Sequence, residues 1–487
     1  MLPARLLTRN IRTMATTTRT YEDAIRSLNS LQSNFAILSA IRASGATMNA
    51  QAIPEMRSWV AASGHSPSDF DTLNLLHIAG TKGKGSTAAF CSSILSQYPT
   101  QRKIGLYTSP HLRAVRERIQ INNKPLSEEL FAKYFFEVWD AIEESVGKEV
   151  VKPVYFRFLT LTALHAFLRE GVDAAVIEVG VGGEYDSTNV IEKPTATGVT
   201  SLGIDHVGVL GNTIEEIAWH KGGVYKPSAV ALSVEQLETA QEVLRKRAEE
   251  NGVEFRVVPV HKDIIEGRVK LGLEAEFQRG NASLAAELVH EHLKKVGVES
   301  GYNADKPLPQ EMVKGLESVV WPGRCQVLKQ GDVEWNIDGA HTMESLEACG
   351  KWFSGRIAEG KKRVLIFNQQ KRDAPEKLMG ALADSLKKYT GKDKLFDTAV
   401  FCTNITFKEA GYKPDLLSVG SDTAAVQALT VQKALATAWS EVDPSTQTHA
   451  VATIEEAVEI AKSEGDVQVL VTGSLHLVGG LLEVIDN

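Results

Sequence analysis

The sequence has few cysteines, no long hydrophobic run and no excess of positive charge. Its four cysteines, in 487 residues, lie far apart and lack the paired short spacing of a zinc site or a dense disulfide framework. No apolar run reaches the roughly eighteen residues that a membrane-spanning helix needs. Lys and Arg number 53 against 61 Asp and Glu, a formal net charge of −8. We therefore expect a soluble protein with free thiols and no nucleic-acid partner, which captures any anionic substrate at a local site.

The first twenty residues differ in composition from the rest of the chain. Residues 1–20 contain several Arg and Thr, and no acidic residue occurs before Glu22. This composition is typical of a mitochondrial transit segment, and a second start at Met14 would give a cytoplasmic form beside the one that starts at Met1. The alternative is a terminus without a targeting role, since short Arg- and Thr-rich tails also arise by chance.

Two regions of the chain alternate short apolar runs with longer helical patterns. The first includes LNLLHIAG, AAVIEVG and TGVTSLGI, and the second includes RVLIFNQ, AVFCTN and VQVLVTGS. This alternation predicts α/β architecture with parallel sheets. A Pro-rich, weakly periodic segment at 303–324 separates the regions and favours a boundary near residue 320. We predict domains at 21–320 and 321–487, and a polar surface insertion at 418–448.

A glycine-rich loop between a strand-like and a helix-like run is the sharpest local signal. It consists of Gly80, Thr81, Lys82, Gly83, Lys84, Gly85 and Ser86. Glycines let backbone N–H groups surround phosphate oxygens, a lysine reaches the outer phosphates, and a hydroxyl can bind Mg²⁺. The spacing departs from the standard Walker pattern, and a ligand-free turn is the alternative. The strand-to-helix context favours nucleotide binding, which makes the first domain a P-loop ATPase domain.

Polar residues also follow several predicted strands. Ser109, Glu178, Asp205 and His206 each come after such a strand, where open parallel sheets gather their ligands. A carboxylate and a hydroxyl suit Mg²⁺ that is bound with a nucleotide. Imidazole is softer than Mg²⁺ prefers, so chemistry alone places His206 outside the ligand shell or against a phosphate. Each residue taken singly could equally be an ordinary structural residue.

Several motifs together resemble folylpolyglutamate synthases of the eukaryotic type, a family of the Mur-type ligase superfamily. They are GTKGKGS, YTSPHLRAVRERIQIN, EVGVGGEYDSTNVI, TSLGIDHVGVLGNTIEEIAWHKGGVYKP, WPGR and DGAH. The resemblance runs from about Tyr21 nearly to the end of the chain, and it implies a smaller, Rossmann-like C-terminal α/β domain.

The resemblance implies an activity and its cofactors. The family activates a folate carboxylate with ATP as an acyl phosphate, which the amine of L-glutamate then displaces to give folylpolyglutamate, ADP and phosphate. It implies ATP, two Mg²⁺ sites and a monovalent cation such as K⁺ as a further candidate. The expected partners are folate and L-glutamate, with a monomeric chain in mitochondria and cytoplasm and at most peripheral association with mitochondrial membranes.

The resemblance also implies roles for residues of the first domain. One Mg²⁺ would lie near Ser86, and a second would be held by Ser109, Glu178 and His206, which makes His206 a direct ligand. Lys221 matches a position that carries a carbamate in related enzymes, although an ordinary solvated lysine is the alternative. With Lys84 and His206, it completes the predicted catalytic set.

The remaining implied contacts bind ATP. Arg324 and Asp338 match positions at the phosphates and the ribose, and His341 lies on the same turn as Asp338. Gln278 and Asn281 resemble adenine-side contacts. The family often has His-Gln where this chain has Phe277 before Gln278, which is a departure from its pattern.

Three other functions stay open on sequence alone. A dihydrofolate synthase uses the same chemistry on a pteroate, and a cell-wall Mur ligase usually carries an additional N-terminal domain. A nucleotide-binding switch would turn over ATP without ligating anything. A ligase should consume ATP only when both folate and glutamate are present.

Overall fold

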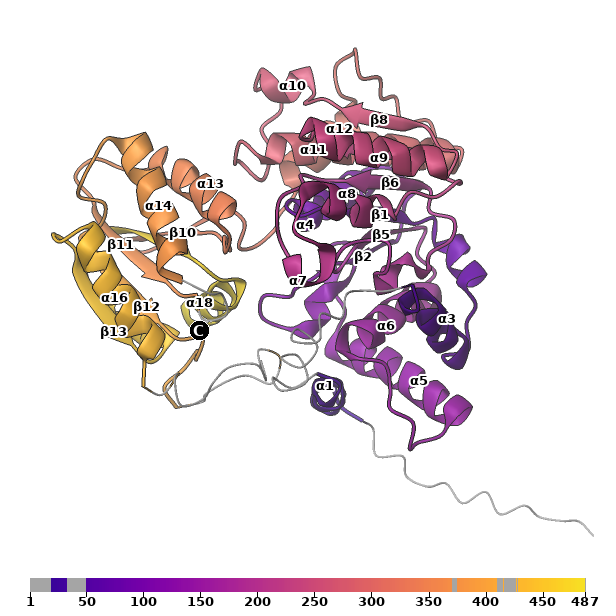
Figure 1. Ribbon diagram of the computed structural model, residues 1–487, viewed down its shortest axis with the longest axis horizontal. Coiled ribbons are helices and arrows are strands. Elements are labelled where there is room, and N and C mark those ends of the chain that lie inside the picture. Colours follow the sequence, from indigo (N-terminus) through magenta and orange to yellow (C-terminus); the bar gives the residue numbers. More distant parts are fainter. Residues whose placement is uncertain are drawn as a thin grey trace, which may run out of the picture.

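The protein, seen in a computed structural model, folds into two α/β regions, each built around a mainly parallel sheet (Figure 1). The structure describes residues 19–32, 50–369, 375–409, 415, 426 and 428–486. Residues 1–18 of the predicted targeting segment and part of the predicted insertion lie outside these ranges, so the transit segment stays a prediction. Among the described residues, no helix is long and apolar enough to cross a membrane.

The first sheet has the strand order β4-β3-β2-β5-β1-β6-β7-β8. The strands from β2 to β8 in this order are parallel, whereas β3 and β4 pair antiparallel at one edge. Their bounds are β1 Leu76–Ala79, β2 Ile104–Tyr107, β3 Ile119–Ile121, β4 Lys124–Pro125, β5 Ala174–Glu178, β6 Ala196–Val199, β7 Ala231–Val234 and β8 Phe255–Val258. This topology confirms the predicted parallel sheet.

Helices cover both faces of this sheet. They are α1 Tyr21–Ser30, α3 Ala52–Ala62, α4 Lys84–Leu95, α5 Glu128–Val146, α6 Tyr155–Glu170, α7 Val207–Leu210, α8 Ile214–Gly222, α9 Glu238–Glu250, α10 Lys262–Ile265, α11 Gln278–Lys295 and α12 Gln310–Ser318. One core cluster joins α4, α11 and α12 to the sheet, and another joins α1, α3, α5 and α6. The central strands are therefore buried on both sides, which explains their nearly continuous apolar sequence.

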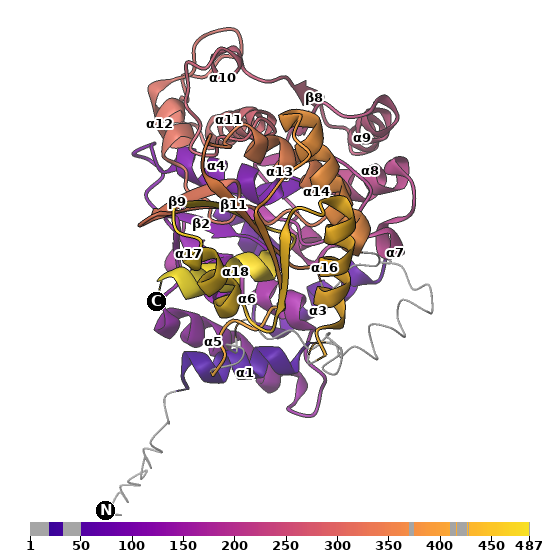
Figure 2. The ribbon, with the colours of Figure 1, turned by 90° about the vertical axis from the view of Figure 1, so that its left-hand side faces the viewer.

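The second sheet has the order β13-β12-β11-β14-β10-β9, with only β9 antiparallel among the strands described. Its elements are β9 Gln326–Gln330, β10 Val333–Ile337, α13 Met343–Ser354, β11 Lys362–Phe367, α14 Pro375–Thr390, β12 Thr398–Cys402, α16 Thr430–Val442, β13 Gln447–Val451, α17 Ile454–Ser463, β14 Val467–Thr472 and α18 Leu475–Asp486. In Figure 2 this region lies in front of the first. It has the predicted α/β character.

The prediction of a surface insertion at 418–448 is wrong for its second half. Residues Thr430–Val442 form α16, which buries Leu435 and Trp439 completely against the second sheet. These side chains are four residues apart and share one helical face, so this part belongs to the core.

The interval between the two sheets is short. Helix α12 ends at Ser318 and β9 begins at Gln326, and residue 320 lies between them. The division of the chain into separate domains at this point stays a prediction.

Candidate active site

The glycine-rich loop connects β1 to the N-terminus of α4, and its backbone conformation requires glycine. Gly80 has φ +145°, and Gly83, which precedes the first turn of α4, has φ +90°. A Cβ at Gly80 would lie 1.8 Å from Thr200 Oγ1, and one at Gly83 would lie 2.2 Å from Asn281 Oδ1. The loop thus presents the positive end of a twelve-residue helix, which is a favourable environment for phosphate.

Two lysines converge on a single carbonyl oxygen of this loop. Lys84 Nζ and Lys221 Nζ donate to the Gly80 carbonyl oxygen over 3.0 and 2.9 Å. Lys221 is almost completely buried in α8. Burial, reinforced by the positive charge of Lys84, holds the pKa of Lys221 well below its usual range, although Asp205 and Asp186 act in the opposite direction. The solvated-lysine alternative for Lys221 is therefore wrong.

Glu178 ends β5 beside the phosphate loop. Its Oε2 accepts a hydrogen bond of 2.8 Å from the Ser109 N–H, and its side chain is buried. Burial raises the pKa of Glu178, while the nearby positive charge of Lys84 lowers it. A Cβ built on Gly85 would lie 3.5 Å from Glu178 Oε2, so this carboxylate faces the loop directly.

Ser86, in the first turn of α4, is held from α11. Gln278 Nε2 donates to Ser86 Oγ over 3.1 Å, and Asn281 Nδ2 donates to Gln278 Oε1 over 2.8 Å. Gln278 is completely buried. It fixes Ser86 and Asn281 from within the protein, and its predicted contact with adenine stays a prediction.

His206 lies immediately before the short helix α7. Its φ of +54° is left-handed, and its backbone N–H donates to Asp205 Oδ1 over 2.9 Å. Lys82 Nζ lies 3.5 Å from Asp205 Oδ2, so Asp205 links His206 to the loop. The described residues contain no group of three or more His, Cys, Asp or Glu arranged for a metal. A magnesium ion bound with a nucleotide does not need one, because phosphate oxygens and water complete its shell.

The C-terminal region contributes a charged turn after β10. Asp338 accepts hydrogen bonds of 2.8 Å from the Cys325 N–H and 2.9 Å from the Ala340 N–H. Burial raises its pKa, while the positive charge of Arg324 lowers it. His341 Nδ1 lies 2.8 Å from the Gly339 carbonyl oxygen, so Nδ1 carries the proton in the neutral ring.

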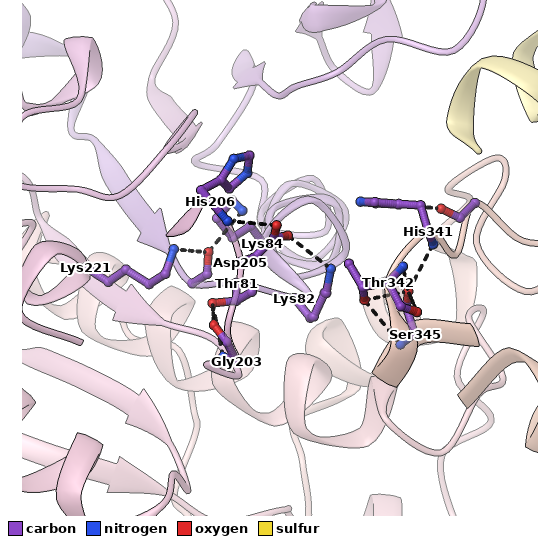
Figure 3. Close-up of polar contacts among 12 residues, drawn as sticks. Thr81, Lys82, Lys84, Gly203, Asp205, His206, Lys221, His341, Thr342 and Ser345 are labelled. Atoms are coloured by element: carbon purple, nitrogen blue, oxygen red, sulfur yellow. Dashed lines mark hydrogen bonds and ion pairs between the residues drawn. The ribbon is translucent and has the colours of Figure 1, made fainter. Parts of the chain in front are cut away.

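These side chains meet in a cavity of about 840 Å³ between the two regions. Figure 3 shows His341 of the C-terminal region opposite the lysines and His206 of the N-terminal region. The predicted residues on its wall are Thr81, Lys82, Gly83, Lys84, Gly85, Ser86, Ser109, Glu178, His206, Asn281, Arg324, Asp338 and His341. Gly80, Gln278 and Lys221 lie behind this wall. The structure thus gathers the predicted residues in one place, while their individual roles stay predictions.

Comparisons with known proteins identify the family. The chain is 46% identical to a folylpolyglutamate synthase of Neurospora crassa over 98% of its own length and 93% of that protein. It is 48% identical to a probable folylpolyglutamate synthase of Schizosaccharomyces pombe over 96% of this chain and 95% of that protein. This chain belongs to the folylpolyglutamate synthase family.

Two further comparisons concern the C-terminal part of the chain and the fold. Residues 324–484 match a family described as the C-terminal domain of dihydrofolate synthetase. The fold resembles a Mycobacterium tuberculosis folylpolyglutamate synthase solved with ADP and AMPPCP, with a TM-score of 0.69 and 23% identity over 89% of this chain and 95% of that one. Folylpolyglutamate synthases are ligases that form amide bonds, so the chain is an enzyme of this class.

Several residues on the cavity wall are not among the predicted site residues. They include Arg118, Arg157 and Phe156. Phe156 and Arg157 begin the segment FRFLTLTALHAF, which resembles the part of the family near the pterin cleft but whose apolar spacing equally fits a core helix, the interpretation that we prefer. Helix α6 does bury most of that segment, but its first turn reaches the cavity. Arg118 lies in the motif YTSPHLRAVRERIQIN, where the three arginines that follow the strand were the available signal.

Proposed function

We propose that this chain is an ATP-dependent folylpolyglutamate synthase that adds L-glutamate to the glutamyl carboxylate of (tetrahydro)folates. The observation that carries the proposal is the single cavity where a phosphate loop, a buried carboxylate and the Arg324 turn meet. The near full-length identity to fungal enzymes of this name supports it. A cavity of about 840 Å³ falls within the range of small-molecule sites.

The charge distribution suits phosphoryl transfer to a carboxylate. A carboxylate is a poor electrophile, whereas an acyl phosphate carries a good leaving group. Formation of the acyl phosphate joins a carboxylate oxygen to the γ-phosphorus of ATP and breaks the bond to the β–γ bridging oxygen, which leaves as ADP. The glutamate amine then attacks the carbonyl carbon and expels phosphate, while the amine gives up a proton. In this proposal Lys84 and the N-terminus of α4 would stabilise the phosphate charge.

The donor set fits a magnesium ion. Glu178 is a buried carboxylate whose pKa is raised by burial, and a cation beside it would favour its ionised form. Glu178 and the hydroxyl groups of Ser86 and Ser109 are hard oxygen donors on one cavity wall. His206 shares this wall and is the predicted nitrogen ligand of the second ion. When bound, magnesium would neutralise charge on the phosphate oxygens. A monovalent cation such as K⁺ belongs to the same proposal.

Lys221 has the property that carbamate formation requires. Only a neutral amine attacks carbon dioxide, and burial favours that form of Lys221. The reaction forms a C–N bond, opens one C=O π bond and releases an N–H proton to solvent. The resulting carbamate would carry a negative charge next to Lys84.

ATP is expected to bridge the two regions. Its phosphates would lie on the loop near Arg324, its ribose near Asp338 and His341, and its adenine near Asn281. Both Asp338 oxygens already accept backbone hydrogen bonds, so a ribose hydroxyl would use a remaining lone pair. Closure of the two regions around ATP would exclude water from the acyl phosphate.

A dihydrofolate synthase is the second candidate, because the profile that matches residues 324–484 carries that description. Mass spectrometry of the products distinguishes the two functions. The purified chain is incubated with ATP, Mg²⁺, K⁺, glutamate and either tetrahydrofolate or pteroate. Tetrahydrofolate that gains successive glutamate units supports the proposed function, and conversion of pteroate alone selects the second candidate. ATP turnover that ignores both substrates would leave only a nucleotide-binding switch. The Lys84→Ala variant is the control for site-dependent turnover.

For cellular location, we infer that residues 1–20 direct one form of the chain to mitochondria and that a start at Met14 leaves another in the cytoplasm. A monomer that binds folate and glutamate, with at most peripheral contact with mitochondrial membranes, completes the proposal. Fluorescent fusions of the chains that start at Met1 and Met14 test the targeting step. Identical distributions would contradict it.

A further inference from the structure

A loop between β2 and β3 contacts both the cavity and the C-terminal region. We call residues 110–118 the docking loop. It begins directly after Ser109, whose N–H holds Glu178, and it ends at Arg118, which lines the cavity. The position of this loop therefore affects two charged groups of the site.

The C-terminal region anchors the docking loop at successive residues. Leu112 packs against the core of the second sheet, and a Cβ at Gly479 would lie 1.9 Å from the Leu112 carbonyl oxygen. Arg113 forms an ion pair with Asp486. His111 Nε2 lies 2.9 Å from the Asp415 carbonyl oxygen.

His111 connects Asp415 to the cavity. Arg118 Nε donates a hydrogen bond of 2.9 Å to His111 Nδ1, so Nδ1 must offer a lone pair. The Asp415 carbonyl can only accept, so His111 Nε2 must carry the proton. Together the two partners specify one neutral tautomer.

Asp415 is itself fixed by the N-terminal region. Its Oδ1 accepts a hydrogen bond of 2.8 Å from the Val115 N–H and another from the Tyr21 hydroxyl. Its carbonyl oxygen is therefore presented to His111 from a defined position.

The guanidinium of Arg118 is oriented but not neutralised. Its Cζ lies 5.5 Å from the centre of the Tyr155 ring, and its Nε is held by His111. It forms no ion pair with any carboxylate in the described part of the chain. Its charge thus remains available to an anionic group in the cavity.

We propose that His111 is a positioning residue, which transmits the location of the Asp415 carbonyl to Arg118 and so fixes this cation in the cavity. The effect on turnover rests on the proposed ligase function, in which the substrates are anionic. The relay itself is a property of the chain and can be measured without substrate.

A double-mutant cycle tests whether His111 acts through Arg118. Kinetics are measured for His111→Leu, Arg118→Ala and the double variant, with ATP, folate and glutamate each varied in turn. A hydrogen bond to a charged group is usually worth about tenfold in binding or more, so both single variants should raise KM at least about tenfold for the same substrate. The KM of the double variant should be no higher than that of Arg118→Ala. A KM increase in the double variant that equals the product of the two single-variant increases would overturn the proposal.

Variants at Asp415 test the other end of the relay. Asp415→Asn retains an oxygen that can accept from Val115 and Tyr21, whereas Asp415→Ala does not. We expect Asp415→Ala to shift KM for the same substrate as His111→Leu, and Asp415→Asn to remain near wild type. Equal effects of the two variants would contradict the relay.

Two further variants separate positioning from general docking. Asp486→Ala breaks the half-exposed ion pair with Arg113 on the same loop but leaves the relay intact, so it should barely change KM. An increase in KM as large as that of His111→Leu would overturn the proposal. His111→Gln offers a hydrogen-bond acceptor and a donor on one side chain, so it should raise KM less than His111→Leu does.

Nitrogen NMR of the full chain with ¹⁵N-labelled histidine provides a readout that does not depend on activity. The His111 signal, assigned by its loss in His111→Gln, should show the neutral Nε2-protonated tautomer at neutral pH, and Asp415→Ala should change it. A protonated Nδ1 would refute the relay. Absence of folate- and glutamate-dependent ATP turnover in wild type would instead refute the proposed function, and the NMR result would still decide the relay.

Discussion

Replacement of Gly83 by alanine tests how closely the phosphate loop is packed. Gly83 has φ +90°, and its missing Cβ would lie 2.2 Å from Asn281 Oδ1. The left-handed conformation costs alanine about 1–2 kcal/mol. Displacement of a packed neighbour adds roughly 1–3 kcal/mol. The middle of the summed range, about 3.5 kcal/mol, corresponds to a loss of roughly several hundredfold in kcat/KM if all of it acts on ATP use.

Steady-state kinetics with ATP as the varied substrate measure this loss, and thermal unfolding measures stability alongside. Gly171→Ala is the matched control, because Gly171 is also left-handed, with φ +60°, but has no atom within 4 Å of a built Cβ. It should carry only the conformational cost and leave kcat/KM for ATP unchanged.

A second variant isolates the contact with Asn281. Asn281→Ala removes the side chain that the new methyl group would meet, so Gly83→Ala should cost less in that background than in wild type. If Gly83→Ala retains near-normal ATP kinetics, or costs the same in both backgrounds, the close approach of this loop to α11 is not a feature of the active enzyme.

Three other predictions concern charge and protonation. Glu178→Gln should abolish Mg²⁺-dependent turnover while the circular dichroism spectrum stays unchanged, and a near-normal rate would reject the metal assignment. Arg324→Ala should raise KM for ATP more than KM for folate, and the reverse would place Arg324 at the folate. Burial lowers the pKa of His292 from 6.5 to about 4, so its neutral form stabilises the fold above pH 6.5 and this contribution is lost as pH falls towards 4. Between pH 7.5 and 5, the free energy of unfolding measured in urea should therefore fall by about 2 kcal/mol more in wild type than in His292→Gln. Equal decreases would show that His292 is not responsible.

The architecture could be predicted because local sequence determines much of it. Strands such as Leu76–Ala79 are buried on both faces and therefore read as apolar runs. The loop after this strand contains the glycines that its positive φ values require. Helix α8 begins at a capping box formed by Thr213 and Glu216, which is also visible in the sequence.

The misassigned half of the polar stretch shows where composition is a poor guide. Residues 430–442 contain many small and polar residues, but Leu435 and Trp439 are enough to pin the helix to the core. Periodicity was the better signal, because two large apolar residues at helical spacing bury more surface than their number suggests.

Other features of the site depend on long-range packing. The burial of Lys221, the support that Gln278 gives to Ser86, and the contact of Asp415 with His111 each join segments that are far apart in the chain. Motif spacing cannot reveal these contacts, because a lysine or glutamine on a helix has the same sequence signature whether it is buried or solvated.

The way that the cavity holds its cations explains how an acidic chain can bind polyanions. Lys84 donates to a carbonyl oxygen and Arg118 to a neutral imidazole, while Arg324 lies near the Gly323 carbonyl oxygen. None of the three forms an ion pair with a carboxylate among the residues described. Neutral hydrogen-bond partners fix the position of each charge, and the nearby carboxylates of Glu178 and Asp338 interact with these cations without forming ion pairs. A formal net charge of −8 is therefore compatible with a locally attractive site. Because salt screens distant charges more than close ones, added salt should relieve the long-range repulsion between the acidic chain and its anionic substrates, while it weakens their close contacts with the local cations much less.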